Sequence, residues 1–114
     1  MEMIIHLDSD IFDLVNNGTK TIEGRVNDEK RRKLSIGDRL IFVNREDDNN
    51  IIESIVEDLI YFDNFEEMVE EFDIKCLYNE SYTKNDYLDL IKRFYKDEEI
   101  KKNGVVAIIF KKKI

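Results

Sequence analysis

The stretch of this sequence that decides the fold is Gly18-Thr19-Lys20-Thr21-Ile22-Glu23-Gly24-Arg25-Val26. Residues 19–26 alternate in the manner of a β-strand, in which successive side chains point to opposite faces. The even positions Ile22, Gly24 and Val26 predict an apolar, buried face. The odd positions Thr21, Glu23 and Arg25 carry a hydroxyl, a carboxylate and a guanidinium on the opposite face. Gly24 inside a strand indicates a bulge or a close approach of another group to the backbone. This stretch therefore predicts a strand with one buried face and one polar, chemically useful face.

The flanking sequence predicts a single α+β domain over residues 1–114. Apolar runs predict four further strands, at residues 3–7, 39–44, 51–61 and 104–110. Helical spacing and capping residues predict helices over 9–16, where Asp8 or Ser9 is the N-cap, over 64–72 and from Thr83 onward. The polar segment 27–35 reads as a helical turn or loop, and residues 47–50 as a turn. Because strands outnumber helices without strict alternation, we expect a small, largely antiparallel sheet or barrel.

Composition excludes several classes of protein. The chain has 114 residues, 42% of them hydrophobic, so it can bury one core despite its net charge of −8. No apolar run is long enough to span a membrane, and the N-terminus does not resemble a signal peptide. The lone Cys76 fits a reducing, cytoplasmic setting. The single histidine, His6, cannot form a zinc site with the one distant cysteine, so we predict no metal site and expect His6 to be partly buried.

The charge is distributed unevenly along the chain. Residues 20–45 hold eight basic and four acidic side chains, whereas residues 57–73 hold eight acidic side chains and no basic one. Two solvated faces would explain this pattern. A phosphate-facing patch around Lys30, Arg31 and Arg32 would explain it equally well. The acidic segment predicts either a surface that favours solubility or a protein-interaction helix at residues 64–72.

Residues 12–26, with Ile36-Gly37-Asp38 ahead of the next strand, resemble the hallmark of the ASCH-domain family, and residues 27–32 resemble its small prokaryotic branch. The Phe65-Glu66-Glu67 stretch and the closing run from Gly104 to Ile108 match in order as well. The resemblance covers nearly the whole chain. It implies a PUA-like small β-barrel of mixed, largely antiparallel strands with flanking helices, and binding of RNA or a modified nucleoside in a polar cleft beside the barrel.

Two interpretations of the polar strand face remain open. Glu23 and Arg25 could form only a structural salt bridge, or they could line the cleft together with Lys20 and contact a base or phosphate. A carboxylate suits an exocyclic amine such as that of cytosine. Tyr87 and Tyr95 fall in the apolar helical pattern and read as core. The predicted ligand-binding residues are Lys20, Thr21, Glu23, Arg25, Lys30, Arg31, Arg32, Tyr78 and Tyr82.

The resemblance also raises an enzymatic alternative. Some bacterial members are similar to amidohydrolases acting on N4-acylated cytidine, with a lysine, a threonine nucleophile and a carboxylate. The lysine falls on Lys20 and the carboxylate loosely on Glu80, but the threonine position holds Glu23. A Lys20–Glu23 pair could still position water as a general base. The sequence predicts no cofactor, and leaves protein partners and catalysis open.

Overall fold

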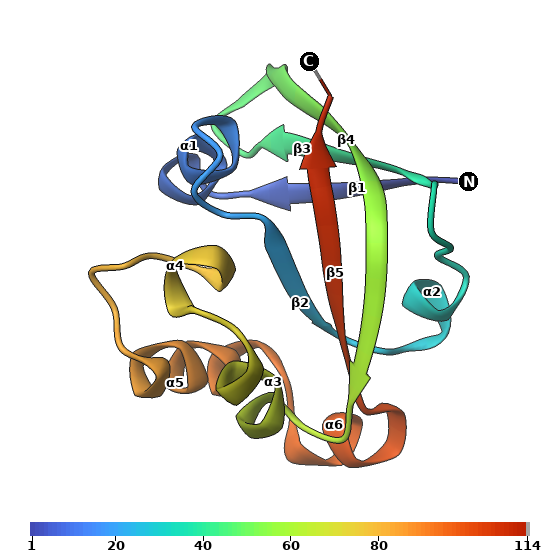
Figure 1. Ribbon diagram of the computed structural model, residues 1–114, viewed down its shortest axis with the longest axis vertical. Coiled ribbons are helices and arrows are strands. Elements are labelled where there is room, and N and C mark those ends of the chain that lie inside the picture. Colours follow the sequence, from blue (N-terminus) through green and yellow to red (C-terminus); the bar gives the residue numbers. More distant parts are fainter. Residues whose placement is uncertain (114) are drawn as a thin grey trace.

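The computed structural model describes residues 1–113 and shows one curled, five-stranded sheet that forms a half-barrel (Figure 1). The sheet order is β1-β3-β4-β5-β2, with β1 parallel to β3 and every other pair antiparallel. The edge strands β1 and β2 make no ladder with each other within the described chain, which leaves the barrel open between them. The strands are β1 (Glu2–Leu7), β2 (Ile22–Val26), β3 (Arg39–Asn44), β4 (Asp47–Phe62) and β5 (Val105–Lys112).

Six helices accompany the sheet in residues 1–113, twice the number predicted. They are α1 (Ser9–Asn16), α2 (Glu29–Arg32), α3 (Phe65–Glu71), α4 (Ile74–Leu77), α5 (Lys84–Phe94) and α6 (Asp97–Asn103). The capping predictions hold for α3 and α5, since Asn64 accepts from the Glu67 N–H and Thr83 from the Asp86 N–H. Helix α4 has a single turn and α6 has no buried residue, so neither produces a helical hydrophobic period.

The hairpin between β3 and β4 corrects the turn predicted at residues 47–50. The chain reverses at Arg45 and Glu46, and residues 47–50 belong to β4. The side chain of Asn44 accepts a hydrogen bond from the Glu46 N–H at 2.9 Å, which fixes this tighter turn. Further along β4, the register shifts between Val56 and Asp58, as expected for a bulge where both faces of a strand are apolar.

The two faces of the sheet carry two separate cores. Along β5, Val106 and Ile108 enter the core that α1 covers, whereas Val105 and Ala107 enter the core beneath the helices α3 to α5. The alternation follows from the two-residue period of a strand. Both faces of β5 are thus buried, and β2 beside it is held between the sheet and the helical layer.

The acidic segment maps to the end of β4 and to α3. Helix α3 turns Phe65, Met68 and Val69 into the core and leaves its glutamates exposed. Its role in binding another protein stays a prediction. None of the helices in residues 1–113 is long and apolar enough to cross a membrane.

Candidate functional site

A cavity of about 360 Å³ lies where the half-barrel is open, between the ends of the two edge strands. Its volume lies near the lower end of the range for small-molecule sites. A wider groove of about 710 Å³ lies beside α6, but it contains no buried charged group. The smaller cavity contains two buried charged groups, Lys20 and Glu23. Its walls come from the β1–α1 turn, β2, the turn after β3, α4 and α5. The lining residues are His6, Leu7, Asp8, Asp10, Ile11, Lys20, Glu23, Gly24, Arg25, Arg45, Leu77, Tyr78, Tyr87, Leu90, Ile91, Phe94 and Tyr95.

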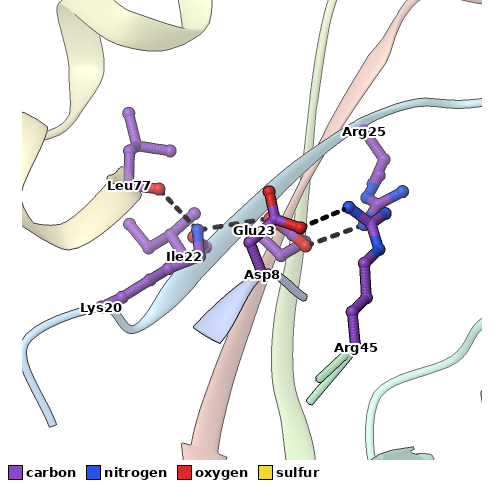
Figure 2. Close-up of polar contacts among 7 residues, drawn as sticks. All are labelled: Asp8, Lys20, Ile22, Glu23, Arg25, Arg45 and Leu77. Carbon is purple, nitrogen blue, oxygen red and sulfur yellow. Dashed lines mark hydrogen bonds and ion pairs between the residues drawn. The ribbon is translucent and has the colours of Figure 1, made fainter. Parts of the chain in front are cut away.

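Lys20 is buried just before β2, with 3% of its surface exposed. Its ammonium donates to the carbonyl oxygen of Ile22 at 2.6 Å and to that of Leu77, and it forms an ion pair with Glu23 Oε1 at 3.2 Å. An ammonium has three N–H donors, so all of them are engaged. Burial lowers the pKa of Lys20, and Glu23 opposes that shift. Lys20 therefore fastens α4 to β2 and holds one oxygen of Glu23 (Figure 2).

Glu23 stands between two cations on the polar face of β2 (Figure 2). Its second oxygen, Oε2, accepts a hydrogen bond from Arg25 Nη2 at 3.1 Å. Burial would raise the pKa of Glu23, but Lys20 and Arg25 together outweigh it and lower that pKa below its ordinary value. Burial alone would lower the pKa of Arg25, but the neighbouring Glu23 carboxylate outweighs burial and raises that pKa. The site thus holds an ionised carboxylate whose two oxygens are fixed, and each oxygen keeps a lone pair for a ligand.

The free edge of β2 adds backbone groups to the cavity. The carbonyl oxygen of Thr21 accepts from Phe110 N–H, and the Asn27 N–H donates to Gly104, so odd-numbered residues face β5. Even-numbered residues therefore direct their N–H and C=O groups away from β5. The Ile22 carbonyl already bonds to Lys20. Gly24, which lines the cavity, is left with an N–H donor and a C=O acceptor on this edge.

A second ion pair lies at the mouth of the cavity. Arg45 Nη1 contacts Asp8 Oδ1 at 2.9 Å, and both side chains are exposed (Figure 2). Asp8 is the N-cap residue of α1, as one of the two predictions has it, but its side chain makes no capping bond to the helix. His6 is exposed and lines the same cavity, which corrects its predicted partial burial. Cavity-lining cations and acids are equal in number, so the cavity has no large net charge.

The wall opposite β2 is largely aromatic. Tyr78, Tyr87, Phe94 and Tyr95 line it, and Phe94 keeps 64% of its surface exposed. The rings of Tyr78 and Tyr87 lie 6.2 Å apart between centroids. Such rings provide flat faces on which a base can stack. The cavity therefore combines a hydrogen-bonding floor with a stacking wall.

Four of the predicted ligand-binding residues share this cavity: Lys20, Glu23, Arg25 and Tyr78. Thr21 lies beside a separate cavity, and its N–H donates to the Cys76 carbonyl. Tyr82 packs its ring 4.8 Å from that of Tyr78, outside the cavity lining. The tentative carboxylate Glu80 is exposed in the loop after α4, also outside the lining.

The basic segment around α2 lies on the other side of β2 from α4 and α5 (Figure 1). Arg31 pairs with Asp28 at 3.4 Å, and Arg32 donates to the carbonyl of Asn27 and the side chain of Asn103. Lys30 is exposed. None of these three side chains lines the cavity as the structure describes it.

Sequence reasoning missed the contributions of Asp8, Asp10, Arg45 and Phe94 to the cavity. It favoured the core for Tyr87 and Tyr95, and both pack in that core while they also line the cavity. Asp8 and Arg45 are separated by 37 positions and meet because β1 and β3 pair in parallel. No local pattern carries that information. The glycine at position 24 was the available signal for Tyr87, since it indicated a close approach to the β2 backbone. In the described residues, no cluster of three or more His, Cys, Asp or Glu side chains could hold a metal ion.

An open half-barrel with a buried ionic cluster at its unpaired edge defines the class of protein, a PUA-like α+β domain. The ASCH domain model matches residues 5–114, and the chain therefore belongs to the ASCH-domain family. This confirms the resemblance first seen around Gly18 to Val26.

Solved structures support the same assignment. The crystal structure of hypothetical protein PH0355 is 30% identical, with a TM-score of 0.86, over 99% of this chain and 100% of the other. The solution structure of protein PF0455 from Pyrococcus furiosus is 29% identical, with a TM-score of 0.78, over 98% and 97% of the two chains. The S128A mutant ASCH protein from Zymomonas mobilis shares the fold alone, at 13% identity and a TM-score of 0.60, over 96% of this chain and 67% of that one. No curated protein matches the sequence.

Proposed function

We propose that this protein binds RNA by taking one unpaired nucleobase into the cavity at the open edge of its half-barrel. ASCH domains are generally thought to bind RNA. The observation that carries the proposal is the Glu23–Arg25 pair, fixed at 3.1 Å on the floor of a cavity with aromatic walls. The carboxylate accepts from N–H groups of a base edge, the guanidinium donates to its acceptors, and the rings stack on its face.

The balance of charge in the cavity favours a base over a phosphate as its occupant. A phosphate would lie beside Glu23, Asp8 and Asp10, whereas a neutral base meets donors and acceptors of both kinds. Phosphates of the same strand would then lie outside, where Arg45 at the mouth can exchange its exposed partner Asp8 for one of them.

The geometry gives less support to an amidohydrolase acting on N4-acylated cytidine. All three N–H groups of the Lys20 ammonium are engaged, and a neutral, proton-accepting amine would have only two N–H groups for its three acceptors, the carbonyls of Ile22 and Leu77 and the carboxylate of Glu23. Glu23 occupies the position of the expected threonine nucleophile and is held by cations on both sides. The arrangement suits fixed recognition of a ligand better than proton transfer.

Replacing Arg25 by lysine tests the proposal. Lysine keeps the positive charge next to Glu23 but loses the planar guanidinium fork. We expect binding of a six-nucleotide single-stranded RNA of mixed sequence, followed by fluorescence anisotropy, to weaken roughly 10-fold, in keeping with the loss of a charge-assisted hydrogen bond. Arg39→Lys is the matched control, because Arg39 is exposed and pairs with Glu2 and Glu53 away from the cavity. Equal affinities of the two variants would contradict the proposal.

A second experiment asks whether α2 contacts the RNA backbone. If Lys30 and Arg31 each neutralise a phosphate, Lys30→Ala with Arg31→Ala should reduce the slope of log affinity against log salt by about 1.4 for the RNA hexamer. Binding of a free nucleoside should not change, since α2 lies away from the cavity. The measurement compares wild type and the double variant between 50 and 200 mM salt. An unchanged slope would assign the phosphate contacts to other residues.

A further inference from the structure

The hydroxyl of Tyr87 lies at the cavity and has no hydrogen-bond partner within residues 1–113. Only 5% of Tyr87 is exposed, and within residues 1–113 its hydroxyl makes no hydrogen bond to the protein, although the residue lines the cavity. The fully buried side-chain atoms without a partner in this part of the chain are Asn27 Oδ1 and Arg31 Nε, so the Tyr87 oxygen is open to the cavity. A bound ligand in the cavity would supply the missing partner.

The ring of Tyr87 does not account for the oxygen. It packs edge-on against Phe65, with 6.5 Å between centroids, and near Tyr78. A phenylalanine at this position would make the same ring contacts. The hydroxyl also leaves no room for a side chain at position 24, because a Cβ built on Gly24 would lie 2.6 Å from the Tyr87 oxygen. Strand β2 thus carries a glycine where the tyrosine oxygen comes close to it.

The surroundings decide whether this hydroxyl donates or accepts. Burial raises the pKa of Tyr87, and the Glu23 charge raises it further, so the phenol keeps its proton. The cavity already holds carboxylates that can accept from the N–H groups of a base, through Glu23, Asp8 and Asp10. A protonated phenol beside them supplies the complementary donor.

We propose, on the basis of the proposed function, that Tyr87 selects the base by donating a hydrogen bond to a carbonyl oxygen while Glu23 accepts from a neighbouring N–H of the same base. Uracil, cytosine and guanine each carry a carbonyl oxygen and an N–H on the edge that pairs in a duplex. The pairing edge of adenine has no carbonyl oxygen, and its acceptor N1 is a ring atom that does not project from the ring as a carbonyl oxygen does. The cavity therefore prefers carbonyl-bearing bases over adenine, and the preference depends on one oxygen atom of the protein.

Tyr87→Phe isolates that atom, because it keeps the ring and removes only the hydroxyl. The probes are uridine and adenosine as free nucleosides, and the hexamers of uridylate and adenylate, titrated calorimetrically. Wild type should bind the uridine probes about 10-fold more tightly than the adenosine probes, as one net hydrogen bond implies. In Tyr87→Phe this ratio should fall to near one through weaker uridine binding, with adenosine binding unchanged. Tyr61→Phe, an exposed tyrosine on β4 outside the cavity, should keep the wild-type ratio.

The outcomes separate the two proposals. If wild type binds neither nucleosides nor hexamers, the proposed function is wrong and the selection by Tyr87 is wrong with it. If wild type binds, but Tyr87→Phe leaves the uridine-to-adenosine ratio unchanged, only the role of Tyr87 is overturned. Equal affinity of wild type for both bases overturns it as well. A preference seen with hexamers and absent with nucleosides would support selection of a base within a strand.

Discussion

The Lys20→Met variant is expected to unfold with a free energy about 3–5 kcal/mol below that of the wild type, the range seen when one partner of a buried ion pair is removed. Lys20 is 3% exposed, and its ammonium serves the carbonyls of Ile22 and Leu77 as well as Glu23. Methionine fills a similar volume but leaves all three acceptors without that donor. Urea denaturation followed by circular dichroism measures the loss.

A surface ion pair provides the control for this variant. Lys84 pairs with Glu70 at 3.6 Å, and the two side chains are 42% and 71% exposed. Lys84→Met should lower the unfolding free energy by about 0–1 kcal/mol, as is usual for exposed pairs. If Lys20→Met loses no more than Lys84→Met, the buried pair does not hold α4 to β2.

Gly24→Ala is expected to lower the unfolding free energy by about 1–3 kcal/mol, as overpacking of a filled core does. The added Cβ would lie 2.6 Å from the Tyr87 oxygen and 2.7 Å from Met68 Cε. The Met68 end can move by rotation, whereas the tyrosine oxygen moves only with its ring. RNA affinity should fall as well, because the displaced ring enters the cavity. Thermal or urea unfolding and anisotropy with the RNA hexamer give the two readouts.

A double variant identifies which contact causes the loss of stability in Gly24→Ala. Tyr87→Phe removes the oxygen closest to the new Cβ, so Gly24→Ala should cost less stability in the Tyr87→Phe background than in the wild type. The difference is a coupling energy of the kind that neighbouring residues show, on the order of 0.5–3 kcal/mol. Additive losses would show that the conflict lies with Met68 or with the backbone.

The fold was predictable because its signals are local. The alternation over residues 19–26 predicted a strand with a buried even face, and β2 indeed buries Ile22 and Val26. The strand segments, the caps Asn64 and Thr83 and the family motif all lie within short windows of sequence. Helix α6 lacked such a signal because it buries nothing, and α4 because it is a single turn.

The site was predictable only in part, because several of its contacts join residues that are far apart in the sequence. Lys20, Glu23 and Arg25 are close in sequence, so one strand brings them together and their proximity could be foreseen. That Lys20 is buried depends on the Leu77 carbonyl, 57 positions away. The Asp8–Arg45 pair likewise depends on the parallel pairing of β1 and β3. Contacts set by strand order in the sheet leave no trace in local spacing or charge.

The strand order also determines when the cavity can be assembled during synthesis. Within residues 1–113, strand β2 pairs with β5 alone, Ile22 with Ile109 and Val26 with Val105. A nascent chain therefore carries Lys20, Glu23 and Arg25 on an unpaired strand until the β5 segment leaves the ribosome. Closing so long a loop is entropically unfavourable and slows folding. The strand that carries Glu23 and Arg25 is thus synthesised well before its partner and is fixed in place only when β5 pairs with it.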